Sequence, residues 1–463
     1  MSRSPLLAHR RPADVLAVRH GTELTVERFL LDAAALAARL PERAQVLNDC
    51  ADRYLFLVGF AAAMLRRQVS LLPGNRAAHV WEQLKEDYPD VYCLTDQDDA
   101  PRVMELFRCV GADAPVGAGP APEIPSFPDT QVAAIAFTSG SSGRPKPFRK
   151  FWGAVAREAC AGGKALGLGP DGGGCIVATV PPQHMYGFVA SVMLPLQHRY
   201  AFSAERPFFP EDIRLVLERC QRPAVLVTTP VQLRACVQER TRLPRLDFIL
   251  SSAAPLPRAV ADQAEALFHT RVLEYYGSTE TGAIAARRQA EADVWRCFDG
   301  VRVRVAPSGF RVDADYFPEP VVLSDVVEIK SPTEFLLLGR DSDMIKIGGK
   351  RSSLVHLNQQ LSEIEGVLDG AFFLAEAQEA REPRLAAFVV APGRTRAEIL
   401  DALRRRVDEV FLPRHLHLVA ALPRSTTGKL PRENLLRLLR AETEKNGASA
   451  ERQSNGETTD EHG

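Results

Sequence analysis

The sequence lacks long apolar runs, an excess of charge of either sign, and closely spaced pairs of cysteines. No apolar run reaches the length of a membrane span, and residues 1–14 contain His9, Arg10 and Arg11 with no apolar core after them, which argues against a signal peptide. With 57 basic and 58 acidic residues, the chain has no net charge that would attract nucleic acid or a membrane surface. The eight cysteines are scattered without a CxxC pair, which indicates reduced thiols in the cytoplasm and no zinc site.

Lysine is scarce as well, because only nine of the 57 basic residues are lysine and the others are arginine. Lysine carries a compact charge on a flexible stem, whereas arginine presents a rigid planar fork. We therefore expect lysine at positions where the planar guanidinium of arginine would not be suitable. Lys146, Lys346 and Lys429 lie in the chemistry-bearing segments described below, although chance placement would also account for them.

The first of these segments is FTSGSSGRPK, residues 137–146, which combines hydroxyls and glycines and ends in a lysine. It follows the apolar run 132–136, so the pattern predicts a short buried strand that leads into a flexible loop. The N–H groups and hydroxyls of such a loop can surround phosphate oxygens. Because Pro147 follows Lys146 where Ser or Thr would be needed, this is not a Walker A loop. A Ser/Gly surface linker is the competing interpretation.

Three further segments decide between these interpretations: YYGSTETG at 275–282, GRDSDMIKIGGKR at 339–351 and PRSTTGKLPR at 423–432. In order and spacing, the four segments together resemble the adenylate-forming superfamily of acyl- and aryl-CoA synthetases, peptide-synthetase adenylation domains and luciferases. The resemblance implies an AMP-forming acid–thiol ligase. In its first step a carboxylate attacks the α-phosphate of ATP, giving an acyl-adenylate and pyrophosphate. A thiol then displaces AMP.

Strand-like and helical segments alternate along most of the chain, which predicts a wound α/β fold with ligands at the carboxyl ends of its strands. The fold class we expect is α/β, with a large multi-layer α/β N-terminal domain and a small mobile α+β C-terminal domain. The predicted parts are the AMP-binding domain at 1–339, a hinge at 340–343, the cap domain at 344–440 and a disordered tail at 441–463.

Local patterns predict individual elements within these domains. The expected helices are 25–40, 54–66, 357–364 and 395–410. The expected strands are 46–48, 70–72, 225–229, 248–252, 372–375 and 385–390. The Pro-, Gly- and Ala-rich segment 114–128 is expected to be a loop before the strand that leads to the phosphates.

The resemblance also implies which residues bind the nucleotide. The Ser/Gly loop would hold the β- and γ-phosphates, Tyr276 and the turn 251–255 would contact adenine, and two charged residues would contact the ribose. The implied set is Thr138, Ser139, Gly140, Ser141, Ser142, Gly143, Lys146, Ala253, Ala254, Tyr276, Gly277, Asp325 and Arg340. A core tyrosine is the alternative for Tyr276, and a linker salt bridge is the alternative for Arg340.

A second implied set acts on the reacting groups. Thr279 would contact the α-phosphate, Glu280 would hold Mg²⁺, and the small domain would insert Lys429 between the acid and the α-phosphate. The predicted acyl-pocket residues are His184, also counted as catalytic, Tyr186 and Ser252, and the predicted hinge pivot is Ser342. The alternatives are a surface charge for Glu280, a solvated loop lysine for Lys429 and a buried, hydrogen-bonded residue for His184.

The phrases FLLLGR at 335–340, KRSSL at 350–354 and FLPR at 411–414 resemble the compact ligases of aryl polyene and xanthomonadin pathways. That likeness implies an aryl or fatty acid as substrate, ATP and Mg²⁺ as cofactors, and coenzyme A or the phosphopantetheine of an acyl carrier protein as the thiol. Two other functions remain open at this point. One is an inactive nucleotide-binding regulatory module, and the other is a luciferase-like adenylating oxidase.

Overall fold

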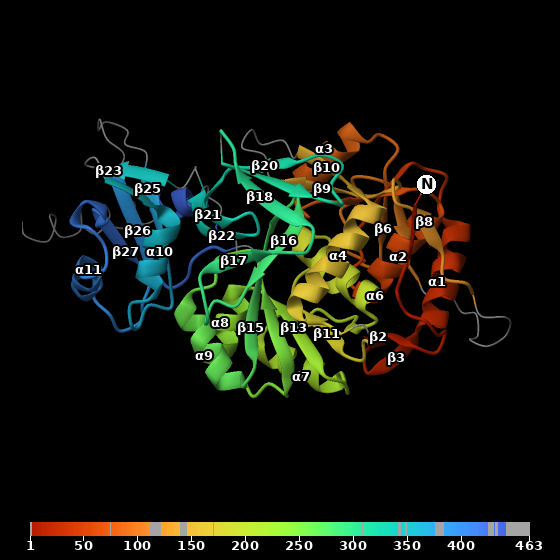
Figure 1. The fold of residues 1–463 in the computed structure, drawn as a ribbon, viewed down its shortest axis with the longest axis horizontal. Coiled ribbons are helices and arrows are strands. Elements are labelled where there is room, and N and C mark those ends of the chain that lie inside the picture. Colours follow the sequence, from red (N-terminus) through yellow and green to blue (C-terminus); the bar gives the residue numbers. More distant parts are fainter. Residues whose placement is uncertain are drawn as a thin grey trace, which may run out of the picture. The chain divides into compact units, whose positions relative to one another are not determined.

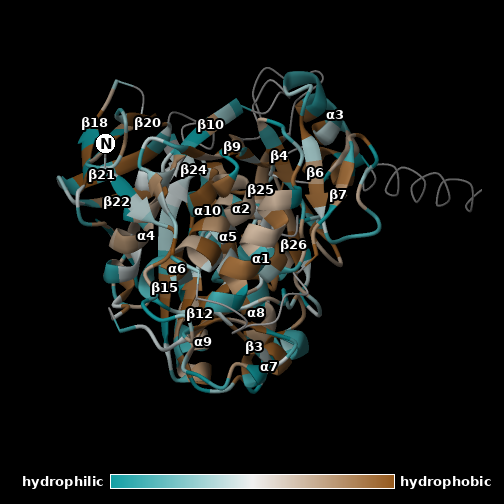
Figure 2. Cartoon of the chain, turned by 90° about the vertical axis from the view of Figure 1, so that its right-hand side faces the viewer, coloured by the Kyte–Doolittle hydropathy of each residue, from teal (hydrophilic) through white to brown (hydrophobic). Residues whose placement is uncertain are grey.

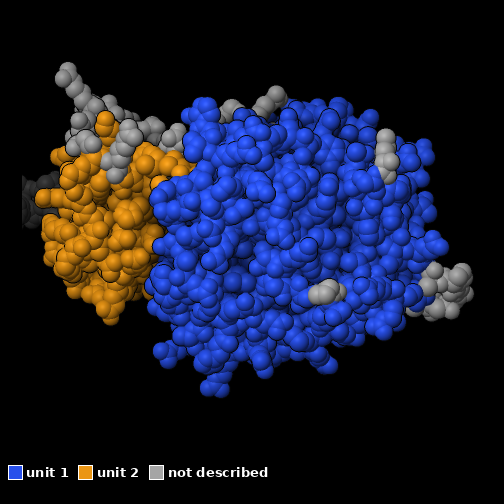
Figure 3. Space-filling view, in the orientation of Figure 1, with its two compact units in different colours: residues 1–323, 328–337 blue, residues 324–327, 338–463 orange. Residues whose placement is uncertain are grey.

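The structure is a computed structural model. It describes residues 2–74, 76–110, 122–138, 146–169, 171–307, 309–340, 344–347, 350–375, 384–424, 430 and 434–440. The chain divides into two compact units (Figure 3). The larger unit comprises residues 1–323 and 328–337, and the smaller comprises residues 324–327 and 338–463. The division therefore passes through the hairpin of β21 (Asp325–Ser331) and β22 (Glu334–Arg340).

Within the described residues, the largest sheet has eleven strands (Figure 1). Its order is β21-β22-β17-β16-β15-β14-β13-β11-β12-β2-β3, and the pairs from β15 through β2 are parallel. The strands not yet bounded are β2 Val15–Arg19, β3 Thr22–Thr25, β11 Cys175–Ala178, β12 Ala201–Ser203, β13 Ala224–Thr228, β14 Leu246–Ser251, β15 Arg271–Ser278, β16 Gly282–Arg287 and β17 Val294–Cys297. The central strands β11 and β13 are buried at every position, as expected for a parallel sheet covered on both faces.

A second sheet of the larger unit has the order β10-β9-β5-β4-β6-β7, and all its pairs except β9–β10 are parallel. Its strands are β4 Gln45–Asn48, β5 Val69–Leu72, β6 Tyr92–Thr95, β7 Leu106–Arg108, β9 Val132–Thr138 and β10 Lys146–Phe151. Two smaller sheets of this unit contain β1 Arg3–Pro5 with β8 Ser126–Pro128, and β18 Val301–Val305 with β19 Phe310–Ala314 and β20 Val321–Leu323.

Polar side chains cap the first two helices of the larger unit. Thr25 accepts a hydrogen bond from the N–H of Arg28 and starts α1 (Val26–Arg39), and Asp52 caps α2 (Arg53–Leu65) in the same way. Helix α2 is apolar around nearly its whole circumference and is buried along its length (Figure 2), which is the pattern of a helix enclosed by the core. The other helices are α3 Ala78–Asp87, α4 Trp152–Leu166, α5 Met185–Gly187, α6 Leu194–His198, α7 Pro210–Arg219, α8 Pro230–Gln238 and α9 Arg258–Phe268, with a π-helical turn at Phe188–Met193.

The smaller unit has its own apolar core. A three-stranded sheet of β25 (Asp369–Ala375), β26 (Arg384–Val390) and β27 (His415–Leu418) is accompanied by α10 (Leu354–Ser362) and α11 (Arg396–Arg404). Leu357, Leu361, Phe372, Ile399 and Leu403 are buried in this core. The hairpin of β23 (Met344–Ile347) and β24 (Lys350–Ser353) precedes α10.

These observations confirm the α/β class and the expected helices and strands in the first 252 residues, with ends that differ by one or two positions. Two expectations were wrong. Residues 126–128 do not stay a loop, because they form β8 and pair with β1. The helix expected over 395–410 ends at Arg404, and the chain then turns into a short 3₁₀ segment at Glu409–Phe411. Among the described residues, no helix is long and apolar enough to cross a membrane.

Candidate active site

The topology of the large sheet brings several of the predicted residues to one edge. Strands β11, β13, β14 and β15 run parallel, so their carboxyl ends meet at the same edge, where α/β proteins bind ligands. Ser252 directly follows β14, Thr279 directly follows β15, and His184 comes six residues after β11. The segments predicted to line the acyl pocket and to contact adenine therefore share this edge with the YYGSTETG segment.

The YYGSTETG segment forms the β15–β16 hairpin, and Thr279 and Glu280 occupy its tip. The side chains of Ser278 and Thr281 close the turn, because each hydroxyl accepts a hydrogen bond from the other residue's backbone N–H at 3.2 Å. Thr281 also donates its hydroxyl to the carbonyl of Gly282 at 2.8 Å. Thr279 and Glu280 themselves are half-buried.

Two glycines make this hairpin possible. A Cβ at position 277 would lie 2.0 Å from the carbonyl oxygen of Gly282, so only glycine fits that close approach. Gly282 has φ +74°, and a Cβ there would lie 2.3 Å from the carboxylate of Glu158 on α4. The glycines of the motif are therefore explained by backbone geometry.

Lys150 and Glu158, which the sequence interpretation did not single out, lie beneath this hairpin. Lys150 is 5% exposed and donates from Nζ to the backbone carbonyl of Glu280 at 2.9 Å. Glu158 is 3% exposed and accepts the backbone N–H of Ala283 at 2.6 Å. Burial lowers the pKa of Lys150, against the opposing effect of Glu158 and Glu280, and burial raises the pKa of Glu158, against the effect of Lys150.

Tyr276 packs in an aromatic cluster within the larger unit. Its ring centroid lies 5.5 Å from that of Trp295, 6.4 Å from that of Phe310 and 5.3 Å from that of Phe335, and the residue is 9% exposed. The ring is thus fixed by its neighbours whether or not a base stacks on it. Its contact with adenine stays a prediction.

The turn after β14 has an unusual backbone. Ala253 has φ +74°, in the left-handed region that non-glycine residues rarely adopt. Ser252, next to it, donates its hydroxyl to the carbonyl of Tyr275 at 2.9 Å, which ties the turn to β15. Such strain is concentrated at functional sites. No residue type in this turn signals the left-handed backbone, because the strained position is an alanine.

His184 and Tyr186 both have well-defined contacts. The backbone N–H of Tyr186 donates to Nδ1 of His184 at 3.3 Å, so the neutral ring carries its hydrogen on Nε2. The Tyr186 hydroxyl is buried and lies 2.8 Å from the Leu250 carbonyl and 3.1 Å from that of Thr228. This hydroxyl joins β13 to β14. The predicted role of these two residues in lining the acyl pocket stays a prediction.

Arg53, at the start of α2, is a further residue that the sequence interpretation missed. It is 1% exposed, and its guanidinium donates to the carbonyls of Ala178 at 3.1 Å and Val180 at 2.8 Å. The same side chain donates to Ser191 Oγ at 3.0 Å, within the π-helical turn. Arg53 therefore holds the segment that leads from β11 to His184. Because arginine is common in this chain, its residue type carried no signal.

The strands on either side of the Ser/Gly loop are described, and the loop itself is not. Thr138 and Lys146 are paired at the ends of β9 and β10, and Lys146 is exposed. Ser139, Gly140, Ser141, Ser142, Gly143, Ser342 and Lys429 lie outside the described residues. Asp325 begins β21 and Arg340 ends β22, and a two-residue connection makes these strands antiparallel, so both residues lie at the same end of that hairpin.

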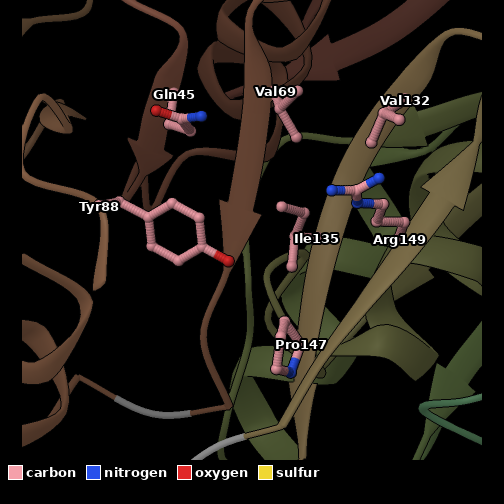
Figure 4. Close-up of a pocket in the computed structure, with 7 residues that line it drawn as sticks. All are labelled: Gln45, Val69, Tyr88, Val132, Ile135, Pro147 and Arg149. Carbon is pink, nitrogen blue, oxygen red and sulfur yellow. The ribbon is translucent and has the colours of Figure 1, made fainter.

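A pocket of about 320 Å³ lies on the face of the β9–β10 pair opposite to Lys150 (Figure 4). It is lined by Gln45, Val69, Tyr88, Val132, Ile135, Pro147 and Arg149, and none of these belongs to the predicted site. Side chains alternate along a strand, so Arg149 faces this pocket whereas Lys150 points to the opposite face of β10.

The fold and the arrangement of the motifs define a nucleotide-handling α/β enzyme, and comparison with known proteins gives its family. Residues 10–306 match the AMP-binding enzyme family. The chain is 29% identical to a 4-coumarate–CoA ligase of Rhodobacter capsulatus over 303 residues, which are 64% of this chain and 74% of the relative. It is 28% identical to a probable 2-succinylbenzoate–CoA ligase of Mycobacterium tuberculosis over 344 residues, covering 68% and 87%.

Solved structures agree with this family at the level of the fold. ATP-bound MatB from Rhodopseudomonas palustris has a TM-score of 0.77 at 21% identity, covering 92% of this chain and 96% of MatB. An o-succinylbenzoate CoA synthetase from Bacillus subtilis, in complex with its acyl-adenylate, has a TM-score of 0.76 at 16% identity, covering 94% and 98%. The chain belongs to the AMP-binding enzyme family. The predicted class, an AMP-forming acid–thiol ligase, is confirmed.

Proposed function

We propose that this enzyme activates a small carboxylic acid, with an aryl acid preferred, as its acyl-adenylate and transfers the acyl group to the thiol of coenzyme A. In the first step a carboxylate oxygen bonds to the α-phosphorus of ATP, and the bond to pyrophosphate breaks. In the second step the thiolate sulfur bonds to the acyl carbon, and AMP leaves with the former carboxylate oxygen. The names of the relatives, which are 4-coumarate– and 2-succinylbenzoate–CoA ligases, support both the acid class and the thiol.

The observation that carries this proposal is the β15–β16 hairpin at the carboxyl edge of the sheet. Thr279 and Glu280, which carry a hydroxyl and a carboxylate, lie at its tip, and both are half-buried. Thr279 would contact the α-phosphate and Glu280 would hold Mg²⁺. The Ser/Gly loop would hold the outer phosphates, because it continues from β9 of the neighbouring sheet.

Mg²⁺ prefers oxygen ligands and usually takes only one or two carboxylates from a protein, with phosphates and water completing its shell. Within the described residues, no group of three or more His, Cys, Asp or Glu side chains could hold a metal ion. A single carboxylate on a closed turn, such as Glu280, fits a metal that arrives with ATP. When bound, the metal would neutralise phosphate charge.

The remaining roles rest on the resemblance of the motifs. Asp325 and Arg340 would contact the ribose, and Lys429 would stabilise the charge that develops at the α-phosphorus. Residues 340–343, with Ser342 as the pivot, would be the hinge between an AMP-binding domain and a cap domain. The phosphopantetheine of an acyl carrier protein offers the same thiol chemistry as coenzyme A, so it is the alternative acceptor.

ATP–pyrophosphate exchange across a panel of aryl and alkyl acids tests the first step. We expect exchange that requires both Mg²⁺ and an acid, with the highest kcat/KM for an aryl acid. Coenzyme A and a phosphopantetheinylated carrier protein are then offered separately, and thioester formation and oxygen uptake are followed. If no acid in the panel supports pyrophosphate exchange, the proposal is overturned. Oxygen uptake without thioester formation would favour the adenylating oxidase.

A further inference from the structure

The buried side chain of Lys150 links two parts of the candidate site that are far apart in sequence. It lies on β10, four residues after Lys146, and contacts the carbonyl of Glu280, which is 130 residues further along. Lys150 is paired with Ala134 of β9, so it faces away from the pocket side of the strand. A lysine at 5% exposure is rare, because removing an ammonium group from water is unfavourable unless it is paired.

The hairpin tip is held from a second side by Glu158. Its carboxylate accepts the N–H of Ala283, three residues after Glu280, and Gly282 leaves the space that lets the carboxylate approach. Helix α4, which carries Glu158, starts directly after β10 and packs against β16 (Figure 1). One continuous segment, β10 with α4, therefore supplies both charged groups that contact the backbone around Thr279 and Glu280.

We propose that Lys150 is a positioning residue that fixes the hairpin tip, so that Thr279 and Glu280 face the nucleotide phosphates. Its ammonium group holds the Glu280 carbonyl, and Glu158 balances the buried charge. The proposal rests on the proposed function, because it assigns a role toward the same phosphates.

Two considerations favour this role over simple stabilisation. Burying two charged groups costs desolvation free energy, and well-packed apolar residues would usually be at least as stable, so stability alone gives no reason for a lysine and a glutamate here. In addition, the chain uses arginine for most of its positive charges and keeps a lysine at this position. A compact ammonium on a flexible stem can reach one carbonyl beneath a tight turn, whereas a planar guanidinium would need more room.

The test compares the wild-type chain with Lys150→Met and with the double variant Lys150→Met/Glu158→Gln. The double variant removes both buried charges and keeps an amide oxygen to accept the Ala283 N–H, so it separates the loss of the Glu280 contact from the effect of an unpaired charge. Arg149→Met is the matched control, because it removes a positive charge one residue away on the opposite face of β10. Binding of AMP and of adenosine is measured by calorimetry without metal, together with Tm.

We expect both Lys150 variants to bind adenosine within about twofold of wild type and to bind AMP at least about fivefold more weakly, because only AMP carries the phosphate that the tip faces. In pyrophosphate exchange, kcat falls at least about tenfold while KM for the acid changes by less than about twofold. Arg149→Met behaves as wild type in both assays.

Three results would overturn the proposal. One is a double variant with wild-type preference for AMP over adenosine. The second is that AMP and adenosine bind equally more weakly and Tm is lower, which would assign Lys150 and Glu158 to stability. The third is a double variant that does not fold, which would lead to the same assignment. The AMP and adenosine comparison needs no acid, so it remains informative if the exchange assay rejects the proposed function.

Discussion

At the scale of single residues, the lysine that contacts the candidate hairpin lies outside every motif. Lys146, inside a motif, is exposed at the end of β10, whereas Lys150, outside every motif, is buried and contacts the hairpin tip. Being four residues apart, the two side chains leave the same face of the strand, and they differ in burial because Lys146 lies at its open end whereas Lys150 lies beneath the hairpin. The sequence interpretation did not single out Lys150, and only the structure identifies its partner.

Lys429 is predicted to act only in the first half-reaction. Lys429→Ala should slow acid-dependent pyrophosphate exchange by at least about 100-fold, because it removes a charge that stabilises the developing negative charge at phosphorus. Transfer of the acyl group from a preformed acyl-adenylate to coenzyme A should stay within about twofold of wild type. Lys445→Ala, which changes a lysine outside the motifs, is the control. Equal losses in both half-reactions would contradict the assignment.

His9 makes the stability of the larger unit depend on pH. It is 4% exposed, and burial lowers the pKa of His9 to about 4. The unfolded chain takes up a proton below about pH 6.5 and the folded chain only below about pH 4, so the contribution of this residue is complete above pH 6.5 and is lost as the pH falls. Relative to His9→Leu, wild type should lose roughly 2–3 kcal/mol between pH 7.5 and 4.5.

Denaturant unfolding of the two proteins at several pH values measures this difference. Replacing the exposed His79 by leucine should leave the pH dependence of wild type unchanged. A His9→Leu variant whose stability falls with acid as steeply as that of wild type would disprove the role of His9.

At the scale of elements, most of the fold follows from local sequence. Short β-rich runs that end in polar residues predict strands β13 and β14, and a threonine cap with helical spacing predicts α1. The errors have local causes too. The capping box at Thr395 and Glu398 marks the start of α11 correctly, but no residue pattern signals its end at Arg404. Strand β8 forms because β1, more than 100 residues earlier, pairs with it, and no local pattern reveals this.

The hairpin β15–β16 requires glycine at position 282. Gly282→Ala should lower stability by about 2–4 kcal/mol, because it adds the strain of φ +74° to a clash with the Glu158 carboxylate. Gly21→Ala is the matched control, since its φ is +82° and a Cβ there would meet nothing within 4 Å. That control should be destabilised by only about 1–2 kcal/mol.

Thermal and denaturant unfolding of the two alanine variants give this comparison. In a Lys150→Met/Glu158→Ala background, which leaves neither buried charge, Gly282→Ala should cost less than in wild type, because the clash with the carboxylate is gone and the backbone strain remains. If Gly282→Ala and Gly21→Ala destabilise the protein equally, the Glu158 side chain moves aside without cost and does not hold the hairpin.

The candidate site was only partly predictable, because contacts between segments far apart in the chain leave no local pattern in the sequence. Motif glycines and hydroxyls can be recognised because the tight turn needs them, as at Gly277 and Ser278. The residues that support the turn, Lys150 and Glu158, come from another strand and a helix, and their contacts arise only when the chain folds. The left-handed Ala253 is likewise invisible in a list of residue types.

At the scale of the whole molecule, the chain consists of two compact units, each with a core of its own. The family match covers residues 10–306, which lie within the larger unit. The predicted hinge at 340–343 comes three residues after the larger unit ends at Leu337. We propose that this connection lets the smaller unit serve the two half-reactions in different orientations.

Ser342→Pro tests this connection. Proline fixes φ near −65°, so it should hinder reorientation between the half-reactions more than it hinders the first one. We expect pyrophosphate exchange within about threefold of wild type and transfer from a preformed acyl-adenylate reduced at least about tenfold. Ser342→Ala keeps φ free and should transfer normally. Undiminished transfer in the proline variant would remove Ser342 from the pivot.

The close approach of Glu158 to Gly282 also has an evolutionary consequence. A carboxylate at 158 forbids any side chain at 282, so neither position can drift alone without harm. Loss of the acid on α4 would remove the clash at position 282 but not the cost of φ +74°, so alanine there would become less damaging without becoming neutral. Substitutions at these two sites, and at position 150, should therefore be inherited as a set.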